Sequence, residues 1–146
     1  MRFLMNITET EDLMRELGRV FLMAHRRIDR AMTACGASLA RTKFLIYIAR
    51  HEGHAHAAGI AELFDLAPRT VTEALDALER DGLITRQADP NDRRVKRLTI
   101  TDEGYRAISA TEPLRHELMD DICRYMTAED KAGLIEGLRK MAAAME

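Results

Sequence analysis

Residues 89–99 combine turn-forming side chains with closely spaced cations. Pro90 fixes its own φ, and the side chains of Asn91 and Asp92 bond back to nearby backbone amides, so together they predict a tight turn. Strand-forming residues flank this turn on both sides, which predicts a β-hairpin over residues 83–100. Four cations lie on its tip and outgoing strand: Arg93, Arg94, Lys96 and Arg97. Because guanidinium groups on a protruding arm reach phosphates or a narrow minor groove, the chemistry indicated is nucleic-acid binding.

The segment directly before the hairpin predicts an amphipathic helix at 68–80. Proline at position 68 suits the first helical turn, and from Val71 the apolar stripe recurs at i, i+3, i+4 and i+7. Taken alone, such a helix fits a solvated surface equally well. Short hydroxyl side chains on its outer face let the backbone approach a phosphate, and an arginine can bind guanine through two hydrogen bonds. The residues that we expect to contact DNA here are Arg69, Thr70, Thr72 and Glu73.

The order of the predicted elements decides between these interpretations. A shorter helix at 57–64 and a three-residue link precede the helix at 68–80, and Asp81 and Gly82 form a helix end directly before the hairpin. Helix, turn, helix and basic hairpin is the order of a winged helix-turn-helix, in which the second helix enters the major groove of DNA.

Helical periodicity also covers both ends of the chain. An apolar seam begins after Thr8, which forms a predicted capping box with Glu11, and two more helical segments follow residue 101, with a kink or break at Pro113. One small winged domain cannot bury all of these seams, so we expect the terminal helices to form a homodimer interface. The fold class predicted is mainly α with a small β-hairpin wing. Its parts are an N-terminal dimerisation helix at 1–36, a winged helix-turn-helix at 37–101 and C-terminal dimerisation helices at 102–146, all in one compact domain.

Composition limits the classes of protein that fit. The chain has 146 residues, 47% of them hydrophobic, which suits a globular domain with a real core. With 22 Lys and Arg against 24 Asp and Glu, the formal net charge of −2 excludes a wholly basic, histone-like binder. No apolar run is long enough to span a membrane, and residues 1–6 lack the apolar region of a signal peptide. We therefore expect a cytoplasmic protein with no membrane partner.

Three histidines close together, His51, His54 and His56, raise the question of a metal site. The zincin pattern needs a second histidine four residues after the first on one helical face, but Ala55 holds that position and Gly53 interrupts the helix. We therefore interpret this segment as a polar connector and expect no metal or other cofactor, with zinc ligation as the alternative.

Cys35 and Cys123 lie far apart in the sequence and are interpreted as free thiols of a reducing compartment. A redox-sensing thiol is the alternative, because Cys35 precedes Gly36 at a predicted helix end where it would be exposed. No serine, histidine or acid occurs at a spacing that indicates a nucleophile with its base, a phosphate loop or a metal triad, so we predict that the protein is not an enzyme.

These motifs resemble those of the MarR family of bacterial transcriptional regulators over almost the whole chain, most specifically in the wing. The matching segments are 60–63, 69–72, 75–84, 89–94 and 98–101. The resemblance implies an obligate homodimer with intertwined terminal helices, which places the helix at 68–80 in the major groove of a pseudo-palindromic operator and the wing in the minor groove. It further implies that Arg94 enters the minor groove and that the Asp92 carboxylate orients it.

Two positions depart from the family pattern. Ala67 stands where a capping serine or threonine is usual, and Asp65 stands where glycine often occupies a left-handed turn position. Both affect the start of the recognition helix, so they concern how closely its base contacts follow the family.

The resemblance also implies a repressor that releases DNA when a small, often aromatic, acid binds between the dimerisation and DNA-binding regions. Such an acid needs a cation and apolar walls. The residues that we expect to form this pocket are Met23, His25, Arg26 and Tyr47. A winged helix retained as a protein-interaction scaffold, without DNA binding, is the competing hypothesis.

Overall fold

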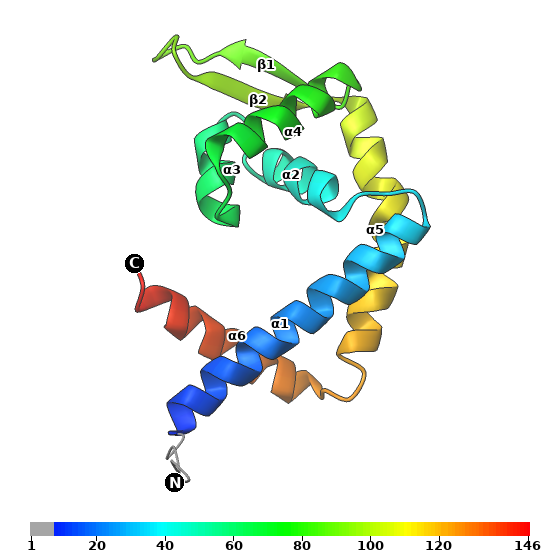
Figure 1. Ribbon diagram of the computed structural model, residues 1–146, viewed down its shortest axis with the longest axis vertical. Helices are drawn as coiled ribbons and strands as arrows, with labels where there is room; N and C mark the ends of the chain where they lie inside the picture. Colours follow the sequence, from blue (N-terminus) through cyan, green and yellow to red (C-terminus); the bar gives the residue numbers. More distant parts are fainter. Residues whose placement is uncertain (1–7) are drawn as a thin grey trace, which may run out of the picture. The chain divides into compact units, whose positions relative to one another are not determined.

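The computed structural model describes residues 8–146, and the expectation about a leader at residues 1–6 lies outside this range. Within it the chain forms six helices and one two-stranded antiparallel sheet (Figure 1). In chain order the elements are α1 (Glu9–Ala34), α2 (Leu39–Arg50), α3 (Ala57–Phe64), α4 (Pro68–Arg80), β1 (Ile84–Ala88), β2 (Lys96–Ile100), α5 (Asp102–Ile122) and α6 (Ala128–Ala143). The predicted fold class, mainly α with a small β-hairpin, is confirmed.

Side-chain caps determine where the long helices begin. The predicted capping box at α1 is present: the Glu11 amide donates to Thr8 Oγ1 over 3.2 Å, and the Thr8 amide donates to Glu11 Oε2 over 2.8 Å. Thr101 caps α5, since its Oγ1 accepts from the Gly104 amide at 3.1 Å and donates to the Gly82 carbonyl at 2.7 Å. These bonds satisfy amides that have no partner within the helix.

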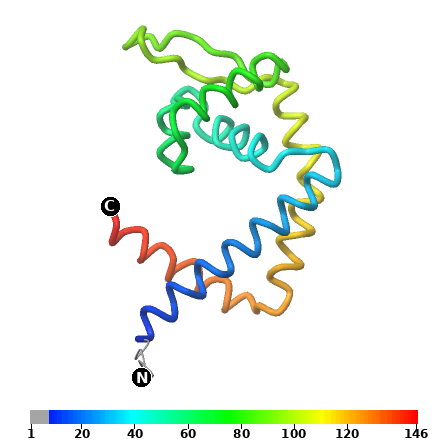
Figure 2. Tube along the Cα trace, viewed as in Figure 1, coloured from blue at the N-terminus to red at the C-terminus, as the bar shows by residue number. Residues whose placement is uncertain are grey.

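The core of the winged region lies between α2, α3, α4 and the hairpin. Its fully buried side chains come from each of these elements, and they include Ile48, Ile60, Val71, Leu75, Leu78, Ile84 and Leu98. The stripe predicted on α4 from Val71 is therefore the buried face of that helix. Figure 2 follows the chain from α4 through a tight reversal into β1 and back along β2.

The hairpin is the predicted wing, shifted by one residue. The register pairs Ile84 with Ile100 and Ala88 with Lys96, so each strand begins one residue later than its composition indicated. A single bridge attaches the wing to the connector between α2 and α3, where the Leu98 amide donates to the Ala55 carbonyl over 2.8 Å. The wing is thus anchored by backbone on one side and by buried Leu98 underneath.

Contacts divide the chain into two compact units, the first ending at Leu114 and the second comprising Arg115–Glu146. The domain boundaries expected from the sequence, after residues 36 and 101, stay a prediction. The division follows Leu114, the residue after Pro113, and helix α5 continues through that proline, so of the predicted kink or break a complete break does not occur. Pro113 has no N–H to donate to the carbonyl four residues earlier, so this point of α5 has one helical bond fewer.

Large apolar side chains remain exposed in both units. On α1 they are Leu13, Met14, Val20, Phe21, Leu22 and Met23, and on α6 and beyond they are Leu134, Ile135, Leu138 and Met145. Faces of this size on single helices are typical of surfaces that a partner covers. Among residues 8–146, no helix is both long and apolar enough to cross a lipid bilayer.

Candidate nucleic-acid interface

The wing tip presents one guanidinium that is both exposed and held in place. Arg94 Nε lies 3.2 Å from Asp92 Oδ1, and Nη2 lies 3.5 Å from Oδ2. The Arg94 backbone amide donates to the same Oδ1 over 3.0 Å, so the carboxylate binds both the backbone and the side chain of this residue. The Arg94 side chain is 91% exposed. Asp92 therefore restricts the guanidinium without withdrawing it from solvent.

Asp89 fixes the turn that carries this pair. Its Oδ1 accepts from the amides of Asn91 at 2.8 Å and Asp92 at 3.3 Å. Such a bond was predicted for the side chains of Asn91 and Asp92; Asp92 makes one to the Arg94 amide, and Asp89 makes the other in place of Asn91. The Asn91 amide, helped by the Asp92 amide and by Arg97 and His56, holds the pKa of the Asp89 carboxyl below its ordinary value, although burial opposes this. The charged form of Asp89 is thus favoured by the folded wing.

The other oxygen of Asp89 faces the base of the wing. Oδ2 lies 3.7 Å from Arg97 Nη2 and 3.8 Å from His56 Nε2, and His56 Nδ1 lies 3.3 Å from the Lys96 carbonyl. Arg97 therefore turns inward, with a buried Nε that has no hydrogen-bond partner among the described residues, and is not an outward phosphate contact. Because His56 precedes α3, this cluster joins the wing to the helix-turn-helix.

The N-terminal turn of α4 presents the predicted base-reading residues to solvent. Arg69, Thr70, Thr72 and Glu73 are all exposed. Arg69 Nε lies 2.9 Å from Glu73 Oε1, yet the Arg69 side chain is 90% exposed and free to exchange that partner for a base or phosphate. The two departures noted above are present in the structure: Ala67 provides no side-chain cap, and Asp65 adopts φ 50° and ψ 53°.

Arg86, in β1, contacts the recognition helix instead of solvent. Its Nη1 donates to Asp76 Oδ1 over 2.7 Å and lies 3.7 Å from Glu79 Oε1. The sequence alone does not predict this contact, because residues 76 and 86 are on different elements and no spacing rule joins them. Arg41 at the start of α2 makes a similar link to Asp81 at the end of α4.

Arg93 and Lys96 complete the cationic surface of the wing. Both are exposed, and neither takes part in an ion pair among the described residues. Arg93 and Arg94 at the tip and Lys96 on β2 thus concentrate exposed positive charge on the wing. The localised charge predicted for a nucleic-acid partner is present in a chain whose formal net charge is −2.

Two of the three clustered histidines, His51 and His56, have different partners. His51 Nδ1 lies 2.8 Å from the Tyr47 carbonyl, whereas His56 belongs to the wing base. Within residues 8–146, no group of three His, Cys, Asp or Glu side chains is arranged to hold a metal ion. Both cysteines are free thiols, Cys35 exposed at the end of α1 and Cys123 partly buried.

A cavity of about 590 Å³ lies between α1, α2 and the end of α3. Its walls are mostly apolar, and its charged or polar members are His25, Asp29, Lys43 and Asp65. Lys43 forms no ion pair among the described residues, and Phe21, Phe44 and Phe64 supply aromatic surface. The turn at 65–66, which leads directly into α4, is part of the wall. Lys43 is thus a cation among apolar and aromatic walls, on a lining that also carries the carboxylates of Asp29 and Asp65.

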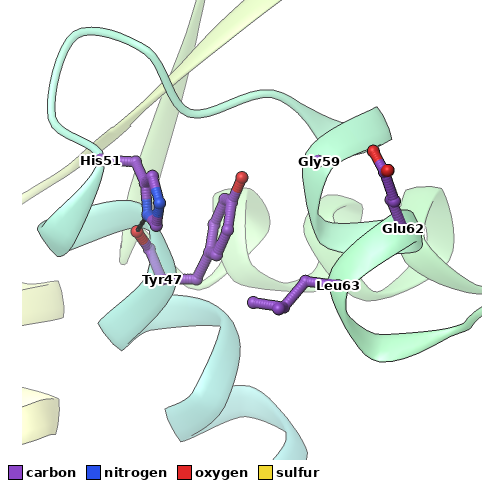
Figure 3. Close-up of a pocket in the computed structure, with 5 residues that line it drawn as sticks. All are labelled: Tyr47, His51, Gly59, Glu62 and Leu63. Atoms are coloured by element: carbon purple, nitrogen blue, oxygen red, sulfur yellow. Dashed lines mark hydrogen bonds between the residues drawn. The ribbon is translucent and has the colours of Figure 1, made fainter. Parts of the chain in front are cut away.

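A second hollow lies between α2 and α3 and is lined by Tyr47, His51, Gly59, Glu62 and Leu63 (Figure 3). The Tyr47 ring stacks on His51 with centroids 4.0 Å apart, and its hydroxyl points toward Gly59. A Cβ at position 59 would overlap that hydroxyl, so the glycine makes the close approach of the two helices possible.

The four residues predicted for an effector pocket do not meet at one place. His25 lines the cavity between α1, α2 and α3, and Tyr47 lines the hollow between α2 and α3. Met23 and Arg26 line neither, and Met23 contacts Arg19 along the exposed side of α1. Lys43, which sequence reasoning did not select, is the cation that lies among the apolar walls. Its place next to Phe44, which lines the same cavity, was the only local signal for it in the sequence.

Comparison with known proteins adds independent information. A model described as the MarR family matches residues 38–96. The HTH-type transcriptional regulator YwhA of Bacillus subtilis is 30% identical over 122 residues, covering 84% of this chain and 87% of YwhA. The HTH-type transcriptional repressor MdtR of the same organism is 28% identical over 135 residues, covering 92% and 86% of the two chains.

Solved structures agree in fold at lower identity. A MarR-family regulator from Silicibacter pomeroyi has a TM-score of 0.82 at 23% identity, covering 99% of this chain and 97% of its own. The S. aureus MepR–DNA complex has a TM-score of 0.71 at 21% identity, covering 87% and 96%. BpsR of Bordetella bronchiseptica, whose DNA binding is regulated by 6-hydroxynicotinic acid, has a TM-score of 0.75 at 18% identity, covering 92% and 96%.

Proposed function

The chain belongs to the MarR family of transcriptional regulators, and from this premise we propose that it is a repressor that binds a pseudo-palindromic DNA operator as a homodimer. Its recognition helix α4 would lie in the major groove, and its wing would reach the adjoining minor groove. The family consists of regulators and not of enzymes. Because its operator would be chromosomal, the protein would act in the cytoplasm.

The Arg94–Asp92 pair at the wing tip is the observation that carries the proposal. A guanidinium that is 91% exposed and also held through its own backbone amide has lost conformational freedom before any partner arrives. Binding then costs less ordering entropy at this residue. Such a group suits the narrow minor groove, where the negative potential is greatest. Arg69, 90% exposed on α4, provides the corresponding contact for the major groove.

The exposed apolar faces of α1 and α6 support the homodimer. Two-fold symmetry brings the same face of each protomer together, so one apolar surface can cover its own copy. A dimer also supplies the second recognition helix that a pseudo-palindromic operator requires, since each half-site takes one helix.

An aromatic acid is the effector class that fits the cavity between α1, α2 and α3. Its ring would lie among the phenylalanines, and its carboxylate would pair with Lys43. The apolar surroundings would strengthen the attraction between these two charges. Because the turn at 65–66 lines the cavity, an occupant would contact the segment that sets the start of α4. A ligand that favours one arrangement of this turn shifts the population away from the DNA-binding form.

The DNA-binding part of the proposal is tested with duplexes enriched from a random-sequence pool by the wild-type protein. Fluorescence anisotropy should detect binding that falls steeply with salt, because phosphate contacts release counterions. Two protomers should bind each duplex. Absence of salt-dependent binding to any duplex would contradict the proposal and favour the interaction scaffold.

The effector part is tested with benzoate and 4-hydroxybenzoate, using benzyl alcohol as the uncharged control. Both acids should displace the protein from the enriched duplex, and benzyl alcohol should not. Lys43→Met should remove the response to the acids while leaving DNA binding intact, and Lys131→Met, in α6, should leave both unchanged. Equal responses of the Lys43→Met variant and the wild type would contradict the placement of the carboxylate.

A further inference from the structure

Recognition helix α4 is acidic, which is unfavourable for an element that approaches a polyanion. Between Pro68 and Arg80 it carries two arginines and three acids, a formal charge of −1. Glu73 has Arg69 beside it on the same helix. Asp76 and Glu79, one turn apart, have no such partner on the helix among the contacts of the described residues. Their charge must be offset from elsewhere if α4 is to lie close to phosphates.

Arg86 supplies that offset from the wing. One nitrogen, Nη1, contacts both acids, Asp76 at 2.7 Å and Glu79 at 3.7 Å. Alternation along β1 turns Arg86 toward α4, whereas its neighbours Thr85 and Gln87 are exposed. The guanidinium thus joins β1 to the outer face of the recognition helix. Ile84, two residues earlier on the same face of β1, is buried in the core.

Exposure separates Arg86 from the other cations of the interface. Its side chain is 22% exposed, against 91% for Arg94 and 90% for Arg69. The acids are more exposed, Asp76 at 53% and Glu79 at 45%, so only the arginine of this ion pair is shielded from solvent. The pair nevertheless joins a strand to a helix, whereas Arg69 and Glu73 lie on one helix, so it has more influence on how β1 and α4 are held relative to each other.

We propose that Arg86 is a positioning residue that acts through Asp76 and Glu79 and does not itself contact phosphate. It holds the wing at a fixed orientation to α4, so that Arg94 and the base-reading face of the helix enter adjoining grooves together. It also neutralises the acids that would otherwise repel the DNA backbone. This inference rests on the proposed DNA-binding function and assigns a role to residues outside the predicted contact set.

The two possible roles of Arg86 predict opposite changes in affinity for the enriched duplex when the two acids are neutralised. If Arg86 contacts phosphate, Asp76→Asn with Glu79→Gln frees it from competitors and reduces repulsion, so binding of the enriched duplex strengthens. If Arg86 positions the wing, the same double variant loses the tether. Binding of the enriched duplex then weakens, although binding of a random-sequence duplex strengthens because the surface is less negative.

The experiment measures four proteins by anisotropy on the enriched duplex and on a random-sequence duplex. They are the wild type, Arg86→Gln, Asp76→Asn/Glu79→Gln and the triple variant. We expect Arg86→Gln to weaken binding of the enriched duplex about ten-fold in the wild-type background and less than about three-fold when the acids are absent, since pairs in direct contact are non-additive. The double variant should lose several-fold in the ratio of enriched to random affinity.

Equal losses from Arg86→Gln in both backgrounds, or stronger binding of the enriched duplex by the double variant, would overturn the positioning role. Thermal unfolding of each variant verifies that it folds. The double variant changes only exposed side chains, so the direction of its affinity change remains informative even if Arg86→Gln is unstable. Wild-type protein that binds neither duplex would contradict the proposed function itself, which is a different outcome from failure of this inference.

Discussion

At the scale of single residues, the wing depends on two aspartates with different tasks. Asp89 accepts amides of the turn and so fixes the backbone, while Asp92 holds the backbone and side chain of Arg94 together. Asp89 restricts the backbone of the loop, and Asp92 restricts the orientation of the Arg94 guanidinium. The turn was predictable from Pro90 and its neighbours, and the role of Asp92 from the family resemblance, whereas no sequence signal distinguished Asp89 as the acceptor.

Replacing Arg94 with alanine should weaken binding of the enriched duplex by about 10- to 100-fold, the range expected for a specific arginine contact in a groove. The slope of log affinity against log salt should also fall by about 1, because one counterion-releasing contact is lost. Anisotropy titrations at several salt concentrations measure both quantities. Arg93→Ala is the matched control: it removes the neighbouring exposed charge and should cost much less. Equal losses from the two variants would contradict the special role of Arg94.

Asp89→Asn should remove a pH-dependent contribution to stability while keeping an oxygen that accepts the turn amides. The pKa of Asp89 is lowered in the folded state, so its stabilising effect is complete above the ordinary value of 3.8 and disappears as the pH falls through the lower folded value. The wild type should therefore exceed the variant in free energy of unfolding near neutral pH, and the difference should shrink between about pH 5 and about pH 3. Denaturant titrations at each pH measure it. A difference that stays constant with pH would contradict this cause.

At the scale of elements, sequence periodicity and caps predicted the helices well, but not the contacts between them. Thr8, Thr101 and Thr127 are local signals, since each cap bonds to an amide three residues later. The link from Arg86 to Asp76 and the cluster of Asp89, Arg97 and His56 join residues separated by up to about 40 positions, and no spacing rule specifies such pairs. The effector residues were scattered for the same reason: which side chains line a cavity depends on packing.

The approach of α3 to α2 gives a prediction at this scale. Gly59→Ala should increase stability by about 1 kcal/mol in a Tyr47→Phe background, because alanine favours the helix and the obstructing hydroxyl is absent. In the wild-type background the gain should be smaller or reversed, since the added Cβ would overlap that hydroxyl and displace a ring stacked on His51. Thermal or denaturant unfolding of the four proteins measures the coupling. Equal effects of Gly59→Ala in both backgrounds would mean that the Tyr47 hydroxyl does not prevent a side chain at position 59.

At the scale of the whole molecule, the exposed apolar faces of the two units require a partner. The sequence predicted these seams from their heptad spacing, yet it did not predict the division of the chain after Leu114. That division depends on which helices share a core, and helical periodicity identifies an apolar face without identifying what covers it.

Leu138→Lys should shift the protein from dimer toward the 16.6 kDa monomer, because it places a charge on an apolar face that we propose to be covered by the second copy. Glu136→Lys, two residues away on a different side of α6, is the control and should leave the dimer intact. Sedimentation velocity over a range of concentrations distinguishes the two species. A dimer that is insensitive to Leu138→Lys would exclude this part of α6 from the interface.

In the proposed complex, two recognition helices and two wings bind one symmetric DNA site. Sequencing of a random duplex pool after selection by the wild-type protein reveals the symmetry and spacing of that site. We expect an enriched pseudo-palindrome whose half-sites lie about 10 base pairs apart, centre to centre. Selection with the Arg94→Ala variant in place of the wild type should not enrich it. Enrichment of no motif, or of an asymmetric motif that the Arg94→Ala variant selects equally well, would contradict the proposed complex.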